Sequence, residues 1–126
     1  MNLQVTEEGQ WYRFRILEKD TWTSSTFFPQ LDSVLARIKT VLAEKPGARI
    51  LFDLMALDTI DSSLITVLVQ TVRMTGVDRV SVLVSHPDVY SWLALLGLDR
   101  LAEIFDSEDA WRQKQEKPDK DYTDSK

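Results

Sequence analysis

Two short apolar runs constrain the fold of this chain more than any other feature. They are RILFDL, residues 49–54, and RVSVLV, residues 79–84. The first is short and almost wholly apolar, which is typical of a central strand buried on both faces of a sheet. Each run is followed by a segment with helical spacing or helix-start residues. Strands that alternate with helices in this way predict an α/β fold, in which helices pack against a sheet.

Four helices are expected, and the second needs the most argument. Their predicted ranges are 29–44, 63–75, 87–96 and 108–111. By propensity the run after Ser63 favours a strand, because several of its residues are β-branched. Its polar residues, however, lie on one helical stripe: Thr66, Gln70 and Arg73. Asp61 or Ser62 can cap such a helix and Gly76 fits just past its end, so we predict a mostly buried helix.

The N-terminal part predicts a β-hairpin. Residues 3–5 and 11–16 alternate between apolar and polar side chains, and TEEGQ, residues 6–10, lies between them as the turn. KDTWTSSTFF, residues 19–28, is rich in Ser and Thr and is expected to be a loop, and AEIFD, residues 102–106, a short edge strand. The predicted fold is therefore an α/β sandwich, a mixed sheet of about five strands with about four helices packed against it.

Composition limits the domain count and the kinds of partner. The chain has 126 residues, 44% of them hydrophobic, which is enough for one domain at residues 1–111. The charged segment 112–126 has almost nothing to bury and is expected to be disordered. The net charge of −5 argues against a nucleic-acid partner. Because no apolar run approaches the ~18 residues of a membrane span and no signal peptide is evident, we expect a cytoplasmic protein without membrane insertion.

The residue inventory excludes most catalytic and metal sites. Without cysteine there can be no disulfide, zinc–thiolate site or cysteine nucleophile. His86 is the only histidine. It has no ligand-spaced partner to predict a metal, and no Gly-x-Ser-x-Gly motif suggests that it activates Ser62. Glycine motifs for phosphate binding are also missing. We expect no enzyme activity, no metal and no cofactor.

Phosphorylation on aspartate is a competing chemistry, because Asp53 ends a buried strand much as the acceptor of a receiver domain does. That chemistry needs an acid pair after the first strand to hold Mg²⁺, and a lysine late in the sheet. Glu7 and Glu8 are expected in the hairpin turn instead, and the last strand ends in Asp106 without a lysine. The receiver interpretation is therefore disfavoured.

The sequence Asp61-Ser62-Ser63 lies where the strand 49–54 leads into the second helix. The first turn of a helix has free N–H groups and about half a positive charge, so it accommodates an anion. An unmodified serine there caps the helix, whereas a phosphoserine adds roughly −1.5 to −2 charges beside its positive end. Asp58 and Asp61 would deepen the negative patch. On the residues alone, a simple N-cap at Asp61-Ser62-Ser63 is the favoured interpretation.

Two segments resemble the STAS domain, the fold of bacterial anti-sigma-factor antagonists. LFDLMALDTIDSSLITVLVQ, residues 51–70, is similar to a signature in which a strand ending in Asp-Leu leads to an Asp-Ser-Ser-Gly-Leu-Gly helix start. VLVSHPDVYSWLALLGLDRLAEIFDSEDAW, residues 82–111, is similar to the C-terminal half of the family. The resemblance spans about Leu3 to Trp111. Leu64 and Thr66 stand where the family usually has its two glycines.

The resemblance implies a non-enzymatic switch of transcription regulation. A family antagonist binds an anti-sigma factor that is also a serine kinase, and is released when the kinase phosphorylates it. Ser62 would be the phosphoacceptor, with Ser63 as the alternative. The implied partner-binding residues are Asp58, Thr59, Asp61, Ser62, Ser63, Leu64, Trp22 and Thr23. The alternative is a STAS scaffold or an accessory subunit that docks on another ATPase, such as a lipid-transport complex, without a phosphoswitch.

Some family members are reported to bind nucleotides weakly, so such binding at the loop edge stays open. The sequence indicates no oligomeric state. Aromatic residues have two interpretations: Trp22, Phe27 and Phe28 could anchor a partner, although core packing is favoured for at least Phe27 or Phe28. Trp92 and residues 95–98 could form a second contact surface, but we assign them to the helical core.

Overall fold

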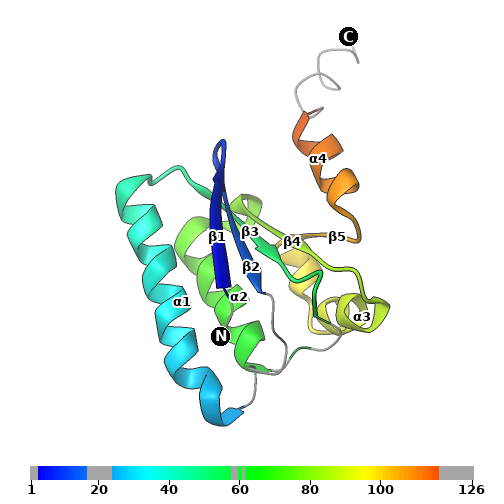
Figure 1. Cartoon of the computed structure of the whole chain (residues 1–126). Helices are drawn as coiled ribbons and strands as arrows, with labels where there is room; N and C mark the ends of the chain where they lie inside the picture. Colours follow the sequence, from blue (N-terminus) through cyan, green and yellow to red (C-terminus); the bar gives the residue numbers. More distant parts are fainter. Residues whose placement is uncertain (1–2, 17–23, 58–59, 61, 117–126) are drawn as a thin grey trace.

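The computed structural model describes residues 3–16, 24–57, 60 and 62–116, with only the backbone described for residues 3, 24–32, 62, 63, 77, 115 and 116. Five strands form one mixed sheet in the order β1-β2-β3-β4-β5 (Figure 1). Their bounds are β1 Leu3–Glu8, β2 Trp11–Ile16, β3 Arg49–Asp53, β4 Val80–Leu83 and β5 Glu103–Phe105. β1 and β2 are antiparallel, and the other neighbouring strands are parallel. The predicted fold class is confirmed.

The hairpin turn is shorter than the sequence predicted. It consists of Gly9 and Gln10, and Glu7 and Glu8 belong to β1, where they pair with Tyr12 and Trp11. Gly9 has a φ of 66°, a left-handed conformation that glycine adopts without steric cost. A two-residue turn with such a glycine matches the twist of the flanking strands, so pairing continues up to the turn.

Four α-helices complete the fold: α1 Ser24–Glu44, α2 Ser62–Thr75, α3 Pro87–Leu95 and α4 Glu108–Glu116. Short 3₁₀ helices, η2 Val77–Arg79 and η3 Leu98–Arg100, precede β4 and β5. α1 begins inside the segment expected to be a loop, since Ser and Thr are also favoured at helix starts. α4 continues past Trp111, so residues 112–116 are helical rather than disordered. Residues 117–126 lie outside the described residues.

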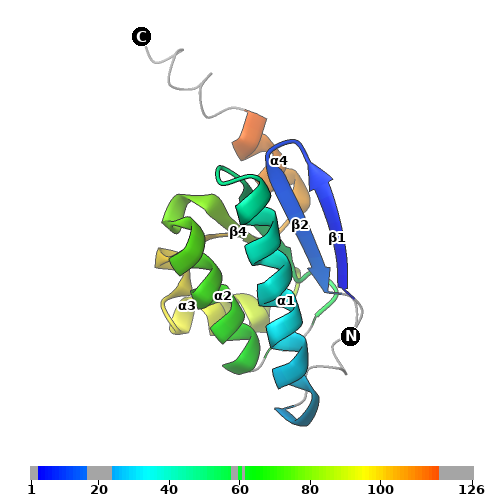
Figure 2. The ribbon, with the colours of Figure 1, turned by 90° about the vertical axis from the view of Figure 1, so that its left-hand side faces the viewer.

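The two faces of the sheet carry different cores. α1, α2 and α3 cover one face, and Figure 2 shows α1 and α2 side by side on it. Apolar side chains from all three helices meet those of the strands there, among them Ile38, Leu64, Val89, Phe14 and Phe52. α4 packs on the opposite face, where a smaller cluster is formed by Trp11, Leu51, Leu83 and Trp111. None of the described helices is long and apolar enough to cross a membrane.

Candidate functional site

The start of α2 occupies the position that the sequence predicted for the switch. β3 ends at Asp53 and α2 begins at Ser62, so Ser62 lies at the edge where the parallel strands end (Figure 1). The run after Ser63 is helical, as predicted. Ser62 and Ser63 are the first two residues of α2, so a phosphate on either would lie in the positively polarised first turn of the helix.

Most of the predicted partner-binding residues lie outside the described residues. These are Trp22, Thr23, Asp58, Thr59 and Asp61. For Ser62 and Ser63 only the backbone is described, so their role stays a prediction. Leu64 is fully buried in the main core, so its side chain supports the fold and does not reach a partner.

Hydrogen bonds hold the beginning of the β3–α2 connection in place. The Oδ1 atom of Asp53 accepts a bond from the Met55 N–H at 3.1 Å, and the Leu54 N–H donates to the Leu83 carbonyl at 2.9 Å. Ser85, in the connection from β4 to α3, donates its hydroxyl hydrogen to the Met55 carbonyl at 2.7 Å. The connections leading to α2 and to α3 are therefore joined at the same sheet edge.

α3, which begins at this edge, exposes several large apolar side chains. Trp92 is 52% exposed, Leu95 78% and Leu96 51%, and Tyr90 is also exposed. We call these four residues the α3 apolar surface. Assigning Trp92, Leu95 and Leu96 to the helical core was wrong; Val89 and Leu93 face the core instead, and of residues 95–98 only Leu98 is buried. A small cavity of about 310 Å³, lined partly by Tyr90, adjoins the surface.

His86 has a structural role at the start of α3. Its Nδ1 atom accepts a hydrogen bond from the Asp88 N–H at 3.1 Å, so the side chain caps the helix. The carboxylate of Asp88 lies 3.9 Å from the same nitrogen. The Nδ1 lone pair of His86 is thus engaged by the backbone at the start of α3.

A buried ion-pair network lies on the α4 side of the sheet. Arg13 is only 5% exposed and Asp53 only 2%. The Nε atom of Arg13 lies 3.3 Å from Asp53, and Arg15 lies 2.9 Å from the same carboxylate oxygen. Asp53 is thus enclosed by two guanidinium groups and anchors Met55. This environment gives Asp53 a structural role rather than that of a receiver phosphoacceptor.

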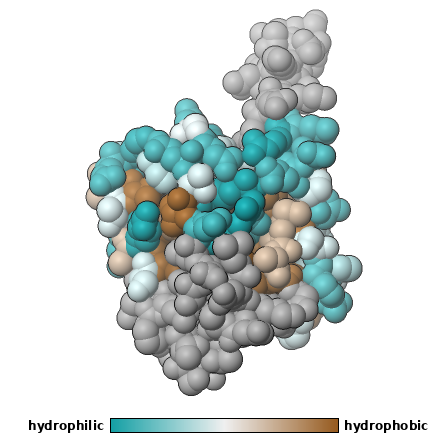
Figure 3. Space-filling view, viewed as in Figure 1, coloured by the Kyte–Doolittle hydropathy of each residue, from teal (hydrophilic) through white to brown (hydrophobic). Residues whose placement is uncertain are grey.

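The same network attaches α4 to the hairpin. Arg13 lies 2.7 Å from Glu108 on α4 and 3.2 Å from Glu8 on β1. Arg112 pairs with both carboxylates, at 2.6 Å from Glu108 and 3.2 Å from Glu8. Hydrogen bonding from Arg13, with help from Arg112, lowers the pKa of Glu108. Hydrophilic residues gather over this end of the molecule in Figure 3. Because Arg112 pairs with Glu108 and Glu8, it belongs to the folded domain and not to the tail.

The fold and the element order define a small α/β domain with its candidate site where β3 leads into α2. The family model of the STAS domain matches residues 21–110, and the chain belongs to this family. The NMR structure of the protein TM1081 is similar, with a TM-score of 0.57 at 16% sequence identity over 90% of this chain and 85% of that one. No curated protein matches by sequence. STAS domains are typically non-enzymatic regulatory modules.

Proposed function

We propose that this protein is an anti-sigma-factor antagonist that binds an anti-sigma serine kinase and is released when Ser62 is phosphorylated. The observation that carries the proposal is the α3 apolar surface, because α3 begins at the same sheet edge as α2. The Ser85–Met55 hydrogen bond ties the two parts of this edge together. A partner that covers α3 from its first turn onward would lie close to the serine that it modifies.

The exposed side chains have the chemistry of a protein–protein contact. Large apolar groups that cluster on a surface mark an interaction site more often than a solvated face. Trp and Tyr are enriched among the residues that contribute most binding energy, and here Trp92 and Tyr90 stand on a regular helix. Because the helix holds them in place, they lose little conformational freedom on docking.

Phosphorylation at the start of α2 would change the contact without breaking the fold. A phosphate at a helix N-terminus interacts favourably with the free N–H groups and the positive end of the helix. The added charge would face the partner beside an apolar contact, where a desolvated charge is costly. Release of the partner then follows from local electrostatics.

A binding experiment with matched variants tests the proposal. The wild type, Ser62→Ala, Ser62→Asp and Trp92→Ala are used as bait in native cytosol, and the recovered kinase is purified for titration and for labelling with ATP. We expect Ser62→Ala to bind but not to be labelled, and Ser62→Asp and Trp92→Ala to bind at least ~10-fold more weakly. Arg37→Ala, an exposed change on α1, serves as the control and should bind normally.

Three outcomes contradict parts of this scheme. If the kinase labels Ser62→Ala as well as the wild type, Ser62 is not the acceptor, and Ser63→Ala tests the alternative. If both Ser62 variants bind equally well while Trp92→Ala does not, the protein is a STAS scaffold on another ATPase. Equal binding by all variants would show that the partner does not contact the α3 apolar surface.

A further inference from the structure

A cavity at the opposite edge of the sheet has the features of an anion site. It measures about 390 Å³ and lies between the hairpin turn, the α1–β3 connection and η2. Three cationic side chains line it, Lys45, Arg49 and Arg79. Among the described residues no carboxylate belongs to the lining, although the chain as a whole has a net charge of −5. The cavity is thus locally positive on an acidic protein.

The two arginines are held in place without being neutralised. The Nη1 atom of Arg79 donates a hydrogen bond to the Pro46 carbonyl at 2.9 Å, which leaves its other N–H groups for a ligand. The guanidinium of Arg49 lies over the Trp11 ring, 5.7 Å from its centroid. Within the described ranges, neither arginine forms an ion pair with a carboxylate.

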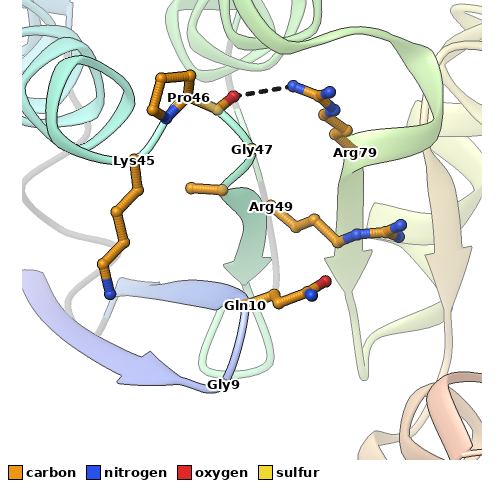
Figure 4. A pocket seen from close by; sticks show the side chains of 8 residues that line it. Gly9, Gln10, Lys45, Pro46, Gly47, Arg49 and Arg79 are labelled. Carbon is orange, nitrogen blue, oxygen red and sulfur yellow. Dashed lines mark hydrogen bonds between the residues drawn. The ribbon is translucent and has the colours of Figure 1, made fainter.

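The charged groups near the cavity do not neutralise Arg49 and Arg79, which can therefore bind an anion. Lys45 turns toward the hairpin, where its amine pairs with Glu7 and lies 5.6 Å from the Tyr12 ring (Figure 4). Lys45 therefore lies at the rim of the cavity, and its positive charge is already balanced by Glu7. The carboxylate of Asp78 is directed to Gly76, since an added Cβ there would lie 3.7 Å from its Oδ1 atom.

The backbone leaves the cavity open for a ligand. Gly9 and Gly47 both line it, and a Cβ added to either residue would meet no atom within 4 Å. Figure 4 shows Arg49 extending on the same side as Gln10, whose amide could bond an ester or hydroxyl oxygen. The volume lies within the range of small-molecule sites, roughly 300–1,000 Å³.

We propose that this cavity binds a phosphorylated small molecule, with Arg49 and Arg79 holding the phosphate group. Guanidinium groups bind phosphate through pairs of parallel N–H···O bonds, and two such groups match a dianion. The site lies at the edge opposite Ser62, so it does not depend on the proposed partner or on phosphorylation. It would give the protein a second input, a ligand bound away from the contact surface.

Amide chemical shifts measured by NMR provide the test. Inorganic phosphate and AMP are each titrated into ¹⁵N-labelled protein at constant ionic strength, and vesicles containing phosphatidic acid are tested by co-sedimentation. With at least one of the three ligands we expect saturable shifts at the Gln10 and Gly47 amides or saturable sedimentation. The ligand that binds most tightly identifies the source of the phosphate. Arg49→Gln and Arg79→Gln should each weaken binding about 10-fold or more.

Matched variants make the result decisive. Arg37→Gln removes an exposed arginine on α1 and should leave binding unchanged. Arg79→Lys keeps the charge but loses the paired donors, so it should bind less tightly than the wild type. Binding that is absent in all three arms, that survives in both glutamine variants, or that is lost equally in Arg37→Gln overturns the proposal.

Discussion

Replacing Trp111 by alanine should destabilise the whole domain, although the residue is on the last helix. Trp111 is only 3% exposed and meets Trp11 edge to face, with ring centroids 5.4 Å apart. Beneath it Leu51 and Leu83 are fully buried, so release of α4 would expose them to water. Truncation of a buried tryptophan typically costs about 3–5 kcal/mol. Against a total stability of about 5–15 kcal/mol, that loss is large.

Urea denaturation followed by far-UV circular dichroism measures this effect, since most of that signal comes from the backbone and the transition midpoint can be compared between variants. Trp92→Ala is the matched control: it removes the same side chain from another helix, but one that is 52% exposed, and should cost less than ~1 kcal/mol. Hydrogen exchange along α4 would show whether the helix is released before global unfolding. If Trp111→Ala and Trp92→Ala unfold at the same urea concentration, α4 does not contribute to the core as described.

Three further predictions concern single positions. Hydrogen bonding from Arg13 lowers the pKa of Glu108, so this contact stabilises the fold above the ordinary glutamate pKa, and the stabilisation is lost as the pH falls below about 4. Glu108→Gln should therefore reduce the difference in unfolding free energy between urea titrations at neutral and at acidic pH. Gly97→Ala should cost ~1 kcal/mol, since Gly97 has a φ of 81°, whereas Gly47→Ala, with open space around it, should change thermal stability little. Leu64→Gly should destabilise by about 3–5 kcal/mol in urea, because it empties a fully buried position and places glycine inside a helix.

The order of helices and strands was predictable because turn and helix-cap residues mark the ends of most elements in this sequence. Ser107 caps α4 by accepting a hydrogen bond from the Ala110 N–H at 3.1 Å, and α2 is helical as the polar stripe indicated. The exposure of α3 was not predictable from its pattern. WLALLGL is apolar on every side, so periodicity cannot show which side meets the core. Only the packing of Val89 and Leu93 decides it.

The burial of Arg13 could not be predicted from local sequence either. In β2 it alternates with apolar residues and would face water if α4 were absent. Glu108, its partner on α4, is 95 residues away in the chain. Propensity and spacing act over one element, whereas this contact depends on the tertiary fold. For the same reason the cavity at Arg49 and Arg79 leaves no motif in the sequence.

The buried network raises the question of why a small domain keeps charges in its interior. Such pairs give little net stability, because desolvation offsets their attraction, and apolar replacements are often as stable. Their geometry is specific, however. Asp53 binds the Met55 N–H through one oxygen and Arg13 and Arg15 through the other, while Arg13 holds α4 through Glu108. An apolar core would pack α4 against the sheet without fixing where the β3–α2 connection starts. We infer that the network fixes the position of the β3–α2 connection more than it adds to the free energy of unfolding, because it links the connection that leads to α2 with α4 on the opposite face of the sheet.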